Sequence, residues 1–113
     1  MERKYRVITF YKDYFQEFFN RQSKKTKAKI IWTLEIIEEL KIVPENYLKH
    51  IEGAKGLYEI RIQSGHDIFR IFCFFEKGNQ IVLINAFRKK TRKTPLKEIE
   101  MALKIKSTYE IDI

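Results

Sequence analysis

The stretch that decides the fold runs from residue 57 to residue 95 and reads LYEIRIQSGHDIFRIFCFFEKGNQIVLINAFRKKTRKTP. It holds three runs rich in β-branched and aromatic residues, a composition that predicts strands. These runs are 57–63, 68–75 and 80–87. Short turns containing glycine separate them, so we expect an antiparallel meander. The first run alternates between apolar and polar residues. The other two are almost continuously apolar, which predicts central strands covered on both faces.

The preceding half of the chain adds one strand and two helices. Residues 4–10 alternate and are β-branched or aromatic, which predicts a first strand. The aromatic residues between Tyr11 and Phe19 recur at the spacing of an amphipathic helix. Ser23 predicts the N-cap of a second helix that ends near Leu40.

The remaining segments complete the expected topology. Residues 42–56 are punctuated by proline and glycine and predict irregular chain. Thr94 predicts the cap, and Pro95 the first turn, of a last helix. We therefore expect one α+β domain over residues 1–113. Its small antiparallel sheet is built from a strand, a helical hairpin, a three-strand meander and a C-terminal helix.

The composition restricts the classes of function. Lys and Arg number 23 against 15 Asp and Glu, a net charge of +8 that favours polyanionic partners over a merely soluble basic surface. Cys73 lies in an apolar run, which indicates a buried, inert thiol in a reducing compartment. We see no signal-peptide pattern and no membrane-length apolar stretch, and we expect a cytoplasmic protein. The spacing of His50 and His66 predicts neither a metal site nor a cofactor.

A dense basic run is the first candidate site. It lies between a buried strand and a helix, so rigid flanks would position its side chains. Its members are Arg88, Lys89, Lys90, Arg92 and Lys93. Arginine forks and lysine point charges suit a phosphate site. The alternative is a solvated basic loop.

Arg70 is the second candidate, because it interrupts a strand that is otherwise too apolar to face water. A charge there needs a partner or a functional cavity. An ion pair with Glu59 would explain it structurally. The hairpin turn also brings Arg61 close to Arg70, and with the basic run the two arginines would form one cationic surface.

The second helix carries apolar residues around more than half of its circumference, which exceeds what a surface helix needs. Trp32 and Ile36 point away from the Ile30–Leu34–Ile37 stripe. We expect them to contact a partner protein or a second copy of the chain. The alternative is that another helix of the same chain covers them.

The order of these elements, together with three segments, resembles the RelE/HigB toxin superfamily and its phage-derived HigB-like branch. The segments are GLYEIRI at 56–62, IFRI at 68–71 and INAFRKKTRKTP at 84–95. The resemblance implies a RelE-like fold and the toxin of a type II toxin–antitoxin module. Such toxins are endoribonucleases that cut messenger RNA, usually in the ribosomal A site and without metal, when the 2′-hydroxyl attacks the adjacent phosphate.

The resemblance also implies roles and partners. Arg61 and Arg70 match positions that hold the scissile phosphate. Lys89 falls near a residue that stabilises the transition state or protonates the leaving oxygen, and the rest of the basic run would bind RNA. The implied partners are a helix-turn-helix antitoxin, messenger RNA and the ribosome, with assembly as a homodimer or as a heterotetramer with the antitoxin.

The sequence departs from several relatives at the positions of acid–base chemistry. Lys93-Thr94-Pro95 stands where they place a Tyr or His, and Glu59 stands where some have Lys. The general base is therefore unassigned. Two other functions share these features: a ParE-like toxin that binds DNA gyrase, and a nucleic-acid-binding module without catalysis. The arginines on the strands favour cleavage over the gyrase reading.

Overall fold

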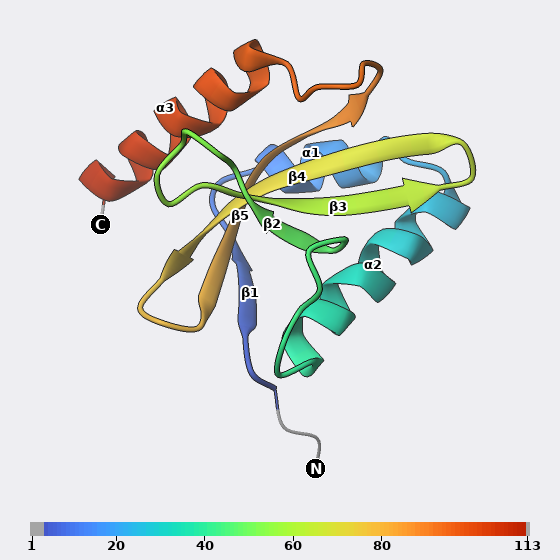
Figure 1. Cartoon of the computed structure of the whole chain (residues 1–113), viewed down its shortest axis with the longest axis horizontal. Coiled ribbons are helices and arrows are strands. Elements are labelled where there is room, and N and C mark those ends of the chain that lie inside the picture. Colours follow the sequence, from blue (N-terminus) through green and yellow to red (C-terminus); the bar gives the residue numbers. More distant parts are fainter. Residues whose placement is uncertain (1–3, 113) are drawn as a thin grey trace.

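The computed structural model describes residues 4–112, which form a mixed sheet with helices on both faces (Figure 1). The elements are β1 (Val7–Phe10), α1 (Tyr14–Asn20), α2 (Lys24–Glu39), β2 (Leu48–His50), β3 (Tyr58–Ser64), β4 (Asp67–Glu76), β5 (Gln80–Lys89) and α3 (Leu96–Asp112). The sheet has five strands in the order β1-β5-β4-β3-β2. The α+β class is thus confirmed. Every helix within residues 4–112 is too short or too polar to span a bilayer.

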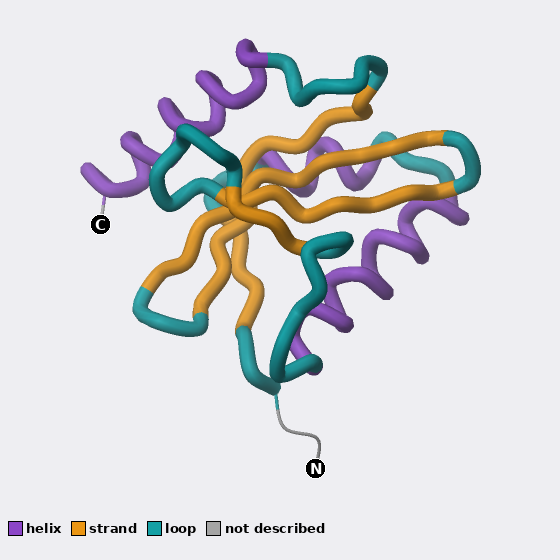
Figure 2. Tube along the Cα trace, in the orientation of Figure 1, coloured by secondary structure: helices purple, strands orange, loops and turns teal. Residues whose placement is uncertain are grey.

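The meander forms as predicted, and the first strand joins it in parallel. β3, β4 and β5 pair antiparallel, and β4 and β5 make the long central pair (Figure 2). β1 pairs parallel to β5, with Val7 opposite Gln80, after which α1 and α2 carry the chain across one face of the sheet. The sheet is therefore mixed, whereas the sequence analysis expected an antiparallel one.

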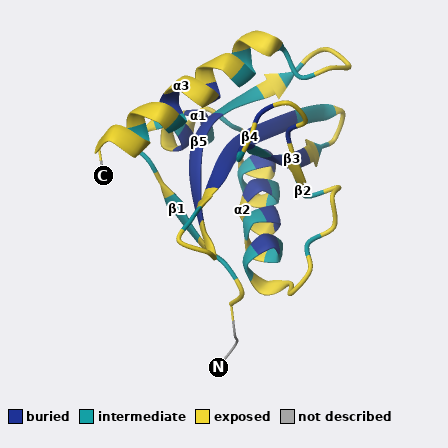
Figure 3. Ribbon diagram, turned by 60° about the vertical axis from the view of Figure 1, so that its left-hand side comes forward, coloured by how far each residue is buried: buried dark blue, intermediate teal, exposed yellow. Residues whose placement is uncertain are grey.

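Apolar side chains cover both faces of the central strands, as the sequence predicts. The ribbon of β4 and β5 is accordingly buried over most of its length (Figure 3). On one face, Ile71 and Leu83 pack with buried residues of α1 and α2. On the other, Phe72 and Ile84 pack with α3 and the loop before β3. Cys73 is fully buried in the first cluster, and that burial raises the pKa of its thiol. The inert, buried thiol is thus confirmed.

The N-terminal boundaries differ from the predicted ones for local reasons. β1 begins at Val7, because the backbone N–H groups of Tyr5 and Arg6 donate to the Glu38 carbonyl at the end of α2 instead of to a strand. α1 begins only at Tyr14, after a left-handed residue, Lys12, with φ 55°. The predicted cap of α2 is confirmed, since the Ser23 hydroxyl accepts from the Thr26 backbone N–H.

Two further expectations are corrected. The segment expected to be irregular contains β2, whose Leu48 packs on the core while Lys49 and His50 are exposed. A strand of three residues shows too little alternation to be recognised from sequence. Pro95 does open the first turn of α3, accepting from the Glu98 N–H. The Thr94 hydroxyl, however, donates to the Glu59 carboxylate instead of capping α3 as predicted.

Candidate functional site

Two arginines face each other across the β3–β4 pair. Arg61 and Arg70 are direct register partners, so their side chains leave the same face of the sheet. Like charges placed opposite each other in a sheet are destabilising. Their neighbours must therefore supply an opposite charge.

Glu59 supplies that charge. Its carboxylate lies 3.6 Å from Nε of Arg61 and 3.7 Å from Nε of Arg70. Glu59 and Arg70 are only 7% and 6% exposed. The ion pair with Glu59 that the sequence suggested is therefore present, and it coexists with the arginine pair.

Arg70 is nevertheless incompletely satisfied. One terminal nitrogen donates to the Phe69 carbonyl at 3.1 Å, but Nε has no hydrogen-bond partner within the described residues. Burial lowers the pKa of the guanidinium, and Glu59 opposes that effect. Because an arginine pKa starts so high, the side chain stays protonated. A buried cation with spare hydrogen-bonding capacity is suited to an incoming oxyanion.

Lys89 ends β5 on the same face as the arginines, opposite Ile68 in register. β5 extends two residues beyond its predicted end, so the sheet fixes the start of the basic run. The pKa of Lys89 is lowered by burial first, then by Arg70 and, more weakly, by Arg61, while Glu59 opposes the shift. A lysine that releases its proton more readily is better suited to general-acid chemistry.

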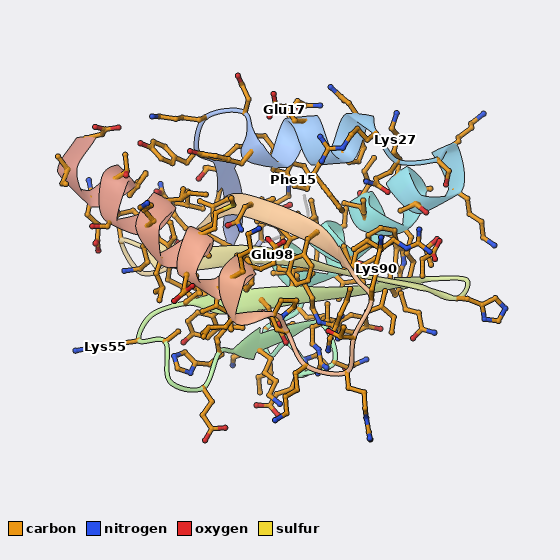
Figure 4. All side chains as sticks on the ribbon, turned by 90° about the horizontal axis from the view of Figure 1, so that it is seen from above. Phe15, Glu17, Lys27, Lys55, Lys90 and Glu98 are labelled. Carbon is orange, nitrogen blue, oxygen red and sulfur yellow. The ribbon has the colours of Figure 1, made fainter. Side chains whose placement is uncertain are left out.

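The remaining basic residues are placed differently. Arg88 pairs in register with Phe69, on the opposite face, and its guanidinium lies 2.7 Å from the Asp67 carboxylate. Lys90, Arg92 and Lys93 are exposed in the loop between β5 and α3. Figure 4 labels Lys90 at the end of β5, where this loop begins. The hydrogen bond from Thr94 to Glu59, 3.3 Å long, attaches this loop to the arginine pair.

The arginines open into a shallow pocket of about 240 Å³. It is lined by Asn46, Arg61, Ile62, Gln63, Ile68 and Arg70. Asn46 lies in the segment expected to be irregular, so no periodic signal could have placed it here. Residues 4–112 contain no cluster of His, Cys, Asp and Glu that could hold a metal ion. The charged side chains that line this pocket are the guanidinium groups of Arg61 and Arg70.

The predicted partner residues lie on α2. Ile30 and Ile37 are buried against the sheet, whereas Trp32 is 43% exposed. The indole contacts Tyr47, with ring centroids 5.9 Å apart, and Nζ of Lys29 lies over it. Ile36 is half-buried. Of the two residues expected to contact a partner, Trp32 is therefore the more exposed.

Comparison with known proteins places this chain in a family. The sequence model of the phage-derived Gp49-like proteins matches residues 17–107. No curated protein matches the chain significantly. One chain of the crystal structure of the archaeal RelE–RelB complex from Pyrococcus horikoshii OT3 is similar, with a TM-score of 0.53 and 14% identity. That similarity covers 79% of this chain and 99% of the archaeal one, and it shows a shared fold.

The charges around Lys89 predict how its pKa responds to substitution. Arg61→Gln removes a neighbouring cation and is expected to raise the Lys89 pKa, whereas Glu59→Gln removes a neighbouring anion and is expected to lower it further. NMR titration of the lysine side-chain signals, assigned with Lys89→Arg, measures both shifts. Equal Lys89 pKa values in all three proteins would show that these side chains are not electrostatically coupled.

Proposed function

This chain belongs to the phage-derived Gp49-like family, and from that membership we propose that it is the toxin of a type II toxin–antitoxin pair, an endoribonuclease that cleaves messenger RNA. The observation that carries the proposal is the placement of Arg61, Arg70 and Lys89 on one face at one end of the sheet. These are the positions at which the resemblance to RelE/HigB toxins implies phosphate binding and proton transfer.

The proposed reaction begins with the scissile phosphate on the arginine pair. Its oxyanion would contact the guanidinium groups of Arg61 and Arg70, which line the same pocket. As the 2′-hydroxyl oxygen attacks, a bond forms between it and phosphorus, and the bond from phosphorus to the 5′-oxygen breaks. The two cations stabilise the charge that develops on the phosphorane oxygens.

Lys89 supplies the proton that the leaving 5′-oxygen needs. Its lowered pKa makes the ammonium a better acid than an ordinary lysine, and its strand position holds it beside the phosphate site. The products are a 2′,3′-cyclic phosphate and a 5′-hydroxyl. The base that accepts the 2′-hydroxyl proton stays unassigned.

A protein partner completes the proposal. The structurally similar chain comes from a RelE–RelB complex, which supports a cognate antitoxin here, of the helix-turn-helix type that the resemblance implies. The net charge of +8 favours an acidic antitoxin. We place the toxin in the cytoplasm, where messenger RNA and ribosomes are available. The exposed cations Lys90, Arg92 and Lys93 would add phosphate contacts to the RNA. Arg88 lies on the opposite face of the sheet and would contact RNA only at the edge of this surface.

Expression of the chain without an antitoxin is expected to stop growth by stopping translation. Pulse labelling of protein, RNA and DNA after induction measures which synthesis fails first. We expect protein labelling to fall first while messages shorten. DNA synthesis that stops first while messages stay intact would instead identify a ParE-like gyrase poison.

Arg70→Ala is expected to reduce the cleavage rate by roughly 100-fold or more, because it removes a preorganised cation from the transition state. Lys55→Ala, which removes an exposed lysine from the loop between β2 and β3, is the charge-matched control and should cleave normally. Lys55 lies on the opposite side of the view from Lys90 (Figure 4). Circular dichroism checks that both variants are folded at the assay temperature. A folded Arg70→Ala protein with full activity would contradict the assigned role.

A further inference from the structure

A second groove lies between α2 and the β3–β4 turn. It measures about 480 Å³ and is lined by Lys25, Ala28, Lys29, Trp32, Gln63, Ser64 and Gly65. That volume lies within the range of pockets that bind small molecules, roughly 300–1,000 Å³. The reaction proposed above uses none of these residues.

Trp32 is the only large aromatic surface in this groove. It is 43% exposed, and Nζ of Lys29 lies 4.7 Å from its ring centroid. The ammonium can move from the ring to a phosphate, because it sits on a long flexible side chain. An exposed indole beside a movable cation matches how proteins hold single-stranded nucleic acid, with a base on the ring and a phosphate on the cation.

The groove combines an aromatic ring with cationic and hydrogen-bonding side chains, a combination that suits a nucleotide. Besides Trp32, only Ala28 contributes an apolar side chain, while Lys25 and Lys29 contribute two cations. The groove also receives Gln63 and Ser64, side chains that can hydrogen-bond to a base or a sugar.

The groove and the arginine pocket meet at one residue. Gln63 lines both, so the two share one side chain as a common wall. β2 pairs with Tyr58–Ile60 and the Arg61 backbone N–H donates to the Tyr47 carbonyl, which leaves the outer edge of β3 without a strand partner from Ile62 onward. The boundary between the two pockets is therefore an open strand edge, across which an extended RNA strand could pass.

We propose that the groove binds one nucleotide of a single-stranded RNA, with its base stacked on Trp32 and a phosphate on Lys29. This nucleotide neighbours the one whose phosphate lies on Arg61 and Arg70. The inference rests on the proposed function and extends it, because it assigns a binding subsite for RNA outside the reacting centre. Trp32 then contributes to affinity and to the path of the strand, and takes no part in the chemistry.

Trp32 is the only tryptophan of the chain, so its fluorescence reports on this groove alone. The probe is a short single-stranded RNA with 2′-O-methyl groups throughout, which cannot be cleaved by its own 2′-hydroxyl. Titration into the full chain should quench the fluorescence saturably. By fluorescence anisotropy of a labelled copy, Trp32→Leu should weaken binding roughly 5- to 150-fold, the range for loss of one base–aromatic stack.

Controls separate this subsite from the surface and from the reacting centre. Phe10→Leu, which changes an exposed aromatic on β1, should bind RNA like the parent. Lys29→Gln should weaken binding and reduce its salt dependence. Circular dichroism shows whether Trp32→Leu and Lys29→Gln are folded. A loss of affinity in a folded variant comes from the subsite, whereas a loss in an unfolded variant comes from misfolding.

Cleavage of an unmodified RNA, measured on the same preparations, keeps the two proposals distinguishable. The subsite would be overturned if the protein cleaves RNA, RNA does not quench Trp32 fluorescence, and Trp32→Leu binds RNA as tightly as the parent. That result would leave the proposed function intact. Absence of both cleavage and binding would overturn the proposed function and the subsite with it. If an acidic protein partner shields Trp32 and RNA leaves its fluorescence unchanged, the groove belongs to that partner instead.

Discussion

A charged guanidinium inside a central strand is the constraint around which the molecule is arranged. Arg70 lies in β4, which is covered on both faces, and the register places Arg61 directly opposite. The repulsion between them is tolerable because Glu59 lies between the two, and Glu59 in turn accepts from Thr94 in the basic loop. One carboxylate thus connects β3, β4 and the chain entering α3. A site built on paired strands holds its cations in fixed directions, which is what stabilisation of a developing oxyanion requires.

Residue patterns predicted the meander, the cap of α2 and the burial of Cys73, because each depends on local spacing or on continuous hydrophobicity. The closeness of Arg61 and Arg70 followed from the hairpin turn alone. The parallel pairing of β1, the short β2 and the contribution of Asn46 did not follow, since they depend on contacts between segments distant in sequence. The Trp32 groove was also missed: the sequence showed an apolar excess on the helix, but only the fold sets Gln63 and Ser64 against it.

Under the proposed function, the two pockets divide RNA binding and cleavage between rigid and adaptable parts. The arginine pocket is fixed by strand pairing and ion pairs, whereas the Trp32 groove and the basic loop present exposed lysines on long side chains. Fixed cations suit the transition state, and mobile cations suit a flexible polyanion whose exact path varies with sequence. An antitoxin that covered either pocket would block the substrate.

The chemical groups at the ends of the RNA fragments test most directly whether cleavage proceeds by attack of the 2′-hydroxyl. Ribosomes programmed with a defined message are incubated with the purified chain, and the fragments are analysed by mass spectrometry. Attack by the 2′-hydroxyl predicts a 2′,3′-cyclic phosphate on one fragment and a 5′-hydroxyl on the other, and no cleavage where the nucleotide before the cut is 2′-deoxy. Fragments carrying a 5′-phosphate and a 3′-hydroxyl, or equal cleavage of the deoxy-substituted message, would contradict it.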